Sequence, residues 1–215
     1  MKVVSTPNAP AAIGPYSQAL DLGNMVFVSG QIPVDPATGK MADTVEEQAA
    51  QSLANLKAIL AEAGLTPVGV VCTHMHYDHH ETSKYFRETY GAKVCLPQIE
   101  ADIVRCEQSL KNHLFNFTMG LVRTNDRLQN LICPVDRVIA FGETAIDFCG
   151  VPLTIVRTPG HSPDHICLIT PDNVCFAGDV LMTEDVLAKA MVPFVFDMAD
   201  DLKSKALMAT LSCNA

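Results

Sequence analysis

A short cluster of histidines constrains the fold more than any other feature of this sequence. Residues 73–80 read Thr-His-Met-His-Tyr-Asp-His-His, and they follow an apolar run at 68–72 that is typical of a buried strand. A strand end gives a rigid base, and the turn after it lets alternate side chains converge. Imidazole and carboxylate groups are ligands for Zn²⁺ and similar ions. The cluster therefore predicts a metal site at the end of a strand.

Two later motifs repeat this arrangement. Gly160-His161 lies in a turn after a strand predicted over 153–157, and Gly178-Asp179 follows a strand predicted over 174–177. Asp179 carries two oxygens, so it is able to bridge two metal ions. Because all three motifs stand at strand ends, we expect them to build one site.

These motifs closely resemble the metallo-β-lactamase superfamily over about residues 64–215, where the order is His-x-His-x-Asp-His, then Gly-His, then Gly-Asp. The resemblance implies a first metal ion on His74, His76 and His161, a second on Asp78 and His79, and Asp179 bridging both. It implies zinc as one or two ions, with iron or manganese as alternatives. It also implies a metal-dependent hydrolase of thioesters or of other esters and lactones. A metal-bound hydroxide would attack, and Asp78 would accept its proton.

The superfamily usually supplies one more histidine near its C-terminus. This sequence has no histidine after His165, so we expect the second ion to have fewer protein ligands and to bind more weakly. His165 itself is expected to lie behind the ligands and to orient His161 or Asp179.

Residues 1–66 carry different motifs. Residues 8–19 read Asn-Ala-Pro-Ala-Ala-Ile-Gly-Pro-Tyr-Ser-Gln-Ala, and residues 28–33 read Val-Ser-Gly-Gln-Ile-Pro. A helix is predicted over about 44–63, with Thr44 as its N-cap. Together these pieces resemble the first half of the RidA family, also called YjgF, which hydrolyses reactive enamines and imines.

The RidA resemblance implies a substrate pocket between the subunits of a trimer. Tyr16, Ser29 and Gly30 match positions that line that pocket. The family's arginine for the substrate carboxylate belongs to the second half of its domain, and no arginine in 68–215 stands in that motif. Without a guanidinium to hold the carboxylate, we expect imine hydrolysis to be weak.

The two resemblances meet near residues 63–67. We predict a RidA-like half domain over 1–67 and a metallo-β-lactamase-like metal-binding region, lacking its last motif, over 68–215. The predicted fold class is α/β, or more loosely α+β. It would be a partial αββα sandwich in which a RidA-like strand-strand-helix segment replaces the N-terminal part.

Composition limits the partners. The net charge is -9 and no basic stripe is visible, which argues against nucleic acid. No apolar run approaches the roughly 20 residues of a membrane helix, and no signal-peptide core follows the N-terminus. We therefore expect a cytoplasmic protein with a small-molecule substrate and no membrane partner. A homo-oligomer is compatible with the RidA resemblance.

Three functions stay open on this reasoning. The first is a metal-dependent hydrolase, and the second is a RidA-like enamine or imine deaminase or ligand-binding trimer. The third is a chimera that binds metal without activity, because a fold alone does not fix a reaction.

Overall fold

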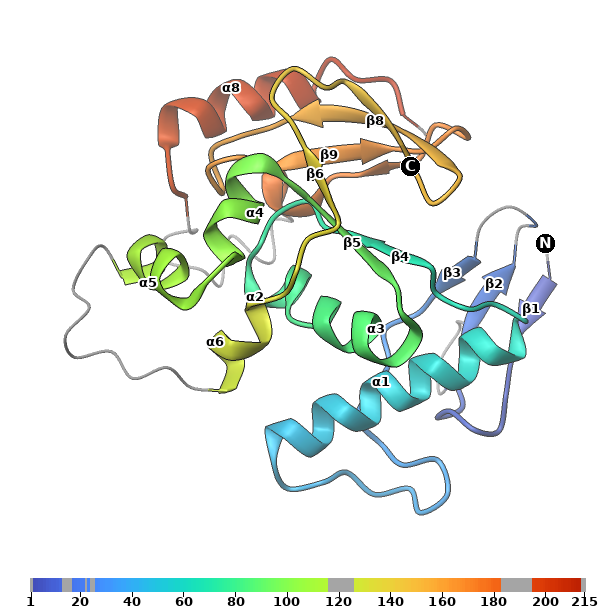
Figure 1. Cartoon of the computed structure of the whole chain (residues 1–215). Coiled ribbons are helices and arrows are strands. Elements are labelled where there is room, and N and C mark those ends of the chain that lie inside the picture. Colours follow the sequence, from blue (N-terminus) through green and yellow to red (C-terminus); the bar gives the residue numbers. More distant parts are fainter. Residues whose placement is uncertain are drawn as a thin grey trace. The chain divides into compact units, whose positions relative to one another are not determined.

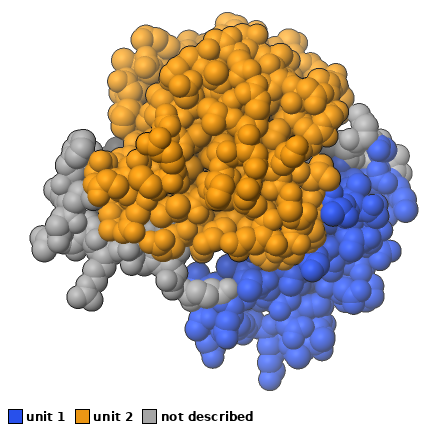
Figure 2. Space-filling view, in the orientation of Figure 1, with its two compact units in different colours: residues 1–66 blue, residues 67–215 orange. Residues whose placement is uncertain are grey.

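The computed structural model describes residues 2–12, 17–21, 23, 26–115, 126–182 and 195–213. The chain splits into two compact units, Met1–Thr66 (unit 1) and Pro67–Ala215 (unit 2), which Figure 2 colours separately. Among the described residues, unit 1 has one sheet and one hydrophobic cluster, whereas unit 2 has two of each, and the predicted mixed α/β class is confirmed. Among the described helices, none has the length and apolar character needed to cross a membrane.

Unit 1 is a small antiparallel sheet followed by one long helix (Figure 1). Its elements are β1 (Lys2–Val4), β2 (Ala19–Asp21), β3 (Val26–Val28) and α1 (Val45–Glu62). The strands pair in sequence order, with Lys2 opposite Asp21. Ile59 of α1 is fully buried in one cluster with Val4 and Ala19, so this helix supplies the core beneath the sheet.

The start of α1 follows the prediction. The Thr44 hydroxyl accepts the backbone N–H of Glu47 at 3.3 Å and donates to the Glu47 carboxylate at 2.8 Å. The side chain thus satisfies one of the backbone donors that every helix start leaves without a partner.

Unit 2 contains two sheets. The first is parallel, in the order β4-β5-β6, and the second is antiparallel, in the order β10-β9-β8-β7. The strands are β4 (Gly69–Val71), β5 (Lys93–Pro97), β6 (Arg137–Ile139), β7 (Ala145–Phe148), β8 (Val151–Arg157), β9 (Ile166–Ile169) and β10 (Cys175–Phe176). The helices are α2 (Tyr77–His80), α3 (Ser83–Tyr90), α4 (Gln98–Val104), α5 (Glu107–Phe115), α6 (Asp126–Leu131), the 3₁₀ turn η2 (Gly178–Val180) and α8 (Met198–Met208).

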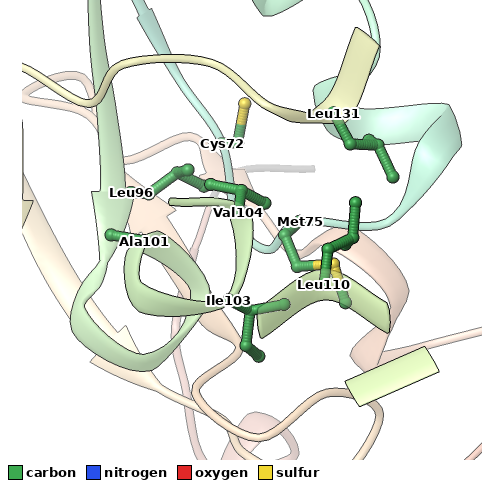
Figure 3. Close-up of a cluster of buried hydrophobic side chains, with 8 residues drawn as sticks. All are labelled: Cys72, Met75, Leu96, Ala101, Ile103, Val104, Leu110 and Leu131. Carbon is green, nitrogen blue, oxygen red and sulfur yellow. The ribbon is translucent and has the colours of Figure 1, made fainter. Parts of the chain in front are cut away.

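The two sheets of unit 2 pack face to face, and helices lie on their outer sides (Figure 1). Cys95 of β5 is buried between the sheets with Ile155 and Leu168 of the second sheet. Its neighbour Leu96 points the other way, as alternation along a strand requires. Figure 3 shows Leu96 in the cluster beneath the helices, together with Cys72, Met75, Ala101, Ile103, Val104, Leu110 and Leu131. The order helix, sheet, sheet, helix is the predicted layering.

Two short helices follow β5, and a break separates them: α4 ends at Val104 and α5 begins at Glu107. Val104 and Leu110 are both fully buried in the same cluster. In one straight helix, residues six apart would point about 120° away from each other. The break lets both side chains reach the core.

Candidate metal centre

The first ligand loop leaves β4 and runs through His74 and His76 to the short helix α2. The backbone carbonyl of Thr73 accepts the N–H of Ile166 at 3.1 Å, which ties the loop to the start of β9. The Thr73 hydroxyl lies 3.0 Å from Nδ1 of His74, whose ring is fully buried. These two contacts hold His74 in position without a bound ion.

The second ligand loop follows β8 and carries His161. The carbonyl of Gly160 accepts the N–H groups of Phe196 at 2.8 Å and Asp197 at 2.9 Å, just before α8. Gly160 has φ +133°, and a Cβ there would overlap the backbone of Asp201. Only glycine allows α8 to approach this closely, so the helix holds the loop of His161 in place.

Three imidazoles from these two loops converge. One ring nitrogen each of His74, His76 and His161 lie within 4.8 Å of one another. Nδ1 of His76 is 2.9 Å from Nε2 of His161. Nε2 of His74 is buried and has no hydrogen-bond partner in the described part of the chain. Such a nitrogen is unfavourable without a partner, and a metal ion would supply one. This donor set therefore fits a divalent ion.

A second group forms beside the first from His74, His79 and Asp179. Oδ1 of Asp179 is 3.0 Å from Nε2 of His79, while Oδ2 is 3.4 Å from Nε2 of His161. The two carboxylate oxygens thus face the two groups separately, which is the arrangement a bridging ligand requires.

The pKa shifts in the cluster favour the protonation states in which imidazole and carboxylate groups bind metal. Burial, followed by the neighbouring imidazoles, lowers the pKa of His74, so its ring is neutral at pH 7. The hydrogen bond from His79 lowers the pKa of Asp179, so that carboxylate is ionised. Neutral imidazole and ionised carboxylate are the forms that bind metal.

His165 lies directly behind Asp179. Its Nε2 accepts the backbone N–H of Asp179 at 3.1 Å, so the ring hydrogen sits on Nδ1, which is 2.7 Å from the Thr158 hydroxyl. Burial lowers the pKa of His165 to about 3, which keeps the ring neutral. A Cβ on Gly178 would stand 2.5 Å from the same Nε2. His165 thus sets the position of the Asp179 backbone.

Glu100 of α4 was missed by the sequence reasoning. It is fully buried and accepts hydrogen bonds from the Ser162 hydroxyl at 2.7 Å, the Asp164 N–H at 2.9 Å and the Met75 N–H at 3.2 Å. Burial raises the pKa of this carboxyl, and the three hydrogen bonds oppose that shift. The sequence offered one indication that Glu100 is buried. It stands three residues before the apolar Ile103, so in a helix the two side chains share one face.

Four further residues were expected to take part in a site. Asp78 belongs to α2, but its side chain lies outside the described residues, as does the whole of Tyr16. Ser29 is half-buried in unit 1, where its hydroxyl donates to the carbonyl of Ser17 at 2.7 Å. Gly30 is exposed beside it. The roles assigned to these four residues stay predictions.

A cavity of about 550 Å³ opens beside the second group. His79 and Gly178 are two of its lining residues, and the others are largely apolar. These others are Val71, Cys72, Thr73, Leu153, Leu168, Cys175, Phe176 and Ala177. An apolar hollow next to a polar cluster is a common form of small-molecule site.

Unit 2 is thus a layered α/β unit with a candidate metal centre at its strand ends. Comparison with known proteins shows what the N-terminal part is similar to. Residues 6–103 match the sequence model of the family described as Endoribonuclease L-PSP, a match that continues past Thr66. The 2-iminobutanoate/2-iminopropanoate deaminase of Salmonella typhimurium is 60% identical over 72 residues, which is 34% of this chain and 56% of the deaminase. The chain therefore spans only about half the length of that relative.

Two solved structures are similar to parts of the chain. Escherichia coli TdcF with bound serine is 42% identical over 43% of this chain and 79% of its own, with a TM-score of 0.37. The BLEG-1 B3 metallo-β-lactamase is 24% identical over 60% of this chain and 57% of its own, with a TM-score of 0.45. The N-terminal part carries RidA/YjgF sequence, as predicted. The metallo-β-lactamase resemblance of unit 2 is carried by its motifs and its two-sheet layering.

Proposed function

We propose that unit 2 is a metal-dependent hydrolase of thioesters or of other esters and lactones, with zinc as its ion. The observation that carries the proposal is the convergence of His74, His76 and His161, in which Nε2 of His74 is buried without a partner. Imidazole sets of this kind suit zinc, and iron or manganese are the alternatives.

Different side chains of unit 2 would take different roles in this reaction. His74, His76 and His161 would hold one ion, which when bound would polarise a carbonyl and ease deprotonation of water. Asp179 keeps its carboxylate ionised between the two groups. His165 keeps the Asp179 backbone in register. Asp78 remains our proposal for the group that takes a proton from the attacking water.

The cavity beside His79 supports a substrate with an apolar portion. Val71, Leu153 and Phe176 line the cavity and suit an acyl group, and the reacting carbonyl would then lie toward the polar cluster at His79. The name of the matched family refers to a ribonuclease. A net charge of -9 instead favours a small molecule over RNA.

Metal analysis tests the proposal first. Protein purified without chelators should carry zinc, iron or manganese in stoichiometric amount, and His74→Ala should reduce this to background because His74 belongs to both groups. His113→Ala is the matched control, since His113 lies in α5 and stacks on Phe196 instead. Wild-type protein without metal above background would refute the metal site, and loss of metal from both variants would refute its location.

Activity is the second readout. Wild-type protein loaded with zinc should hydrolyse at least one member of a panel of thioesters, esters and lactones, and His74→Ala should not. Metal binding without any hydrolysis across the panel would reduce the proposal to a metal-binding protein.

The 60% identity with a deaminase favours a second candidate function, the hydrolysis of enamines or imines by the N-terminal part. A freshly generated imino acid is the substrate to assay. Activity that Tyr16→Phe abolishes and His74→Ala leaves unchanged would support this function over the metal-dependent one. Activity that only His74→Ala abolishes would assign it to unit 2.

A further inference from the structure

Glu100 contacts the first ligand loop through the backbone. Its Oε2 accepts the N–H of Met75 at 3.2 Å. Met75 stands between His74 and His76 in the chain, so this bond fixes the peptide that joins two candidate ligands. Met75 is itself fully buried in the cluster of Figure 3, which gives this loop little freedom to shift.

The other carboxylate oxygen of Glu100 contacts the second ligand loop. Oε1 accepts the Ser162 hydroxyl at 2.7 Å and the Asp164 N–H at 2.9 Å. Ser162 directly follows His161. One carboxylate therefore spans two loops that stand 85 residues apart in the chain, counted from His76 to His161.

Asp164 extends the same connection. Its carboxylate accepts the N–H of Ile99 in α4 at 3.1 Å and pairs with Arg157. Arg157 also donates to the carbonyl of Ala140 at 2.6 Å. The guanidinium supplies positive charge beside the buried Asp164 carboxylate, which would otherwise repel the carboxylate of Glu100. The second loop is thus held to α4 at Ile99 as well as at Glu100.

A buried carboxylate is costly unless its oxygens are hydrogen-bonded. The three hydrogen bonds described for Glu100 all go to the ligand loops, and none goes to its own helix. A residue that served packing alone would be apolar at this position, like its neighbours Ala101 and Ile103. The hydrogen bonds of Glu100 instead connect the two ligand loops to each other through its carboxylate.

We propose that Glu100 is a positioning residue that sets the distance between the His74–His76 loop and His161, and thereby raises the affinity of the histidine group for a divalent ion. This inference rests on the proposed metal binding. Groups that orient metal ligands typically change affinity about 10–100-fold when they are removed.

Glu100→Gln is the main test, because it keeps the size of the side chain. The amide nitrogen is a donor, and it must face a donor of one loop or the other, so at least one loop is released. The zinc dissociation constant, measured by competition with a chelator, should rise about 10–100-fold. Ser162→Ala removes one bond of the three and should give a smaller rise. The visible absorption of Co²⁺-loaded protein should also change in Glu100→Gln, because it reports ligand geometry.

Asp136→Asn is the matched control. The Asp136 carboxylate also accepts a backbone N–H, that of Val94 at 2.8 Å, and pairs with Arg87, but it holds the start of β5 rather than a ligand loop. This variant should bind zinc as wild type does. Equal affinity of Glu100→Gln and wild type, or an equal rise in Asp136→Asn, would overturn the inference.

Two further outcomes separate this inference from the proposed function. If Glu100→Gln does not fold, Ser162→Ala decides, and an unchanged zinc affinity there would overturn the inference. If the wild-type chain binds no zinc, the proposed function fails. Hydrogen exchange at Met75 and Asp164 in metal-free Ser162→Ala and Glu100→Gln then tests the loop geometry, and unchanged exchange would overturn it.

Discussion

Unit 1 and unit 2 differ in how their sequences specify them. The N-terminal part is similar to its relatives along one stretch of sequence, with 60% identity over 72 residues to one deaminase. Unit 2 is marked by a few residues at three strand ends, and the fold brings His74, His161 and Asp179 together. Continuous identity thus indicates a family, whereas the convergence of distant side chains indicates chemistry. The sharper functional hypothesis comes from the part with the sparser sequence signal.

The largest expected effect comes from the loop that carries His161. Gly160→Ala places a Cβ against the backbone of Asp201 at φ +133°, and neither side can move away cheaply. We expect unit 2 to lose about 3–5 kcal/mol of unfolding free energy, measured by urea denaturation. Gly39→Ala in unit 1 is the control, because Gly39 has φ +68° with nothing within 4 Å. It should cost about 1–2 kcal/mol, and equal losses in the two variants would contradict the packing argument.

A pair of core variants tests whether the units behave separately. Ile59 in α1 and Leu96 in β5 are both fully buried, so each change to alanine should cost about 2–5 kcal/mol in its own unit. Hydrogen exchange read peptide by peptide should rise in α1 for Ile59→Ala and in β5 for Leu96→Ala. Faster exchange of both units in both variants would show that they unfold as one body.

Removal of the His165 imidazole should have a smaller effect, and this effect should be confined to metal affinity. His165→Leu leaves the Asp179 N–H without its acceptor. Zinc affinity should fall about 10–100-fold, measured by chelator competition, while exchange in α1 stays unchanged. His113→Leu serves as the reference histidine. Wild-type affinity in His165→Leu would mean that the Asp179 backbone does not need this partner.

The smallest effect is expected at the start of α1. Thr44→Ala removes the side-chain acceptor for the Glu47 N–H and should lower the stability of unit 1 by about 1 kcal/mol. Thr44→Ser keeps the acceptor and should restore most of this loss. Thermal unfolding measures both. Zinc affinity should be the same in all three proteins, and a change in it would contradict the separate roles of the units.

The features that were predictable depend on neighbours in the chain. Thr44 and the apolar spacing after it place α1, since a cap and a helix face are local properties. The ligand loops were predictable because His74 and His161 each stand a few residues past a recognisable strand. Nothing local revealed that Glu100 joins these loops, because its hydrogen bonds cross 25 to 64 residues of chain. The break between α4 and α5 likewise reflects a core formed by distant residues.

His74 belongs to both ligand groups, yet it has one nitrogen to offer, because Nδ1 already lies 3.0 Å from the Thr73 hydroxyl. Its buried Nε2 is able to serve a single ion. The two groups therefore compete for a shared donor instead of adding up to two complete sites. Among the described side chains, an ion that takes this nitrogen leaves His79 and Asp179 for a second ion, with Asp78 as the further ligand that the motif implies. The stoichiometry at saturation should report whether that second ion binds.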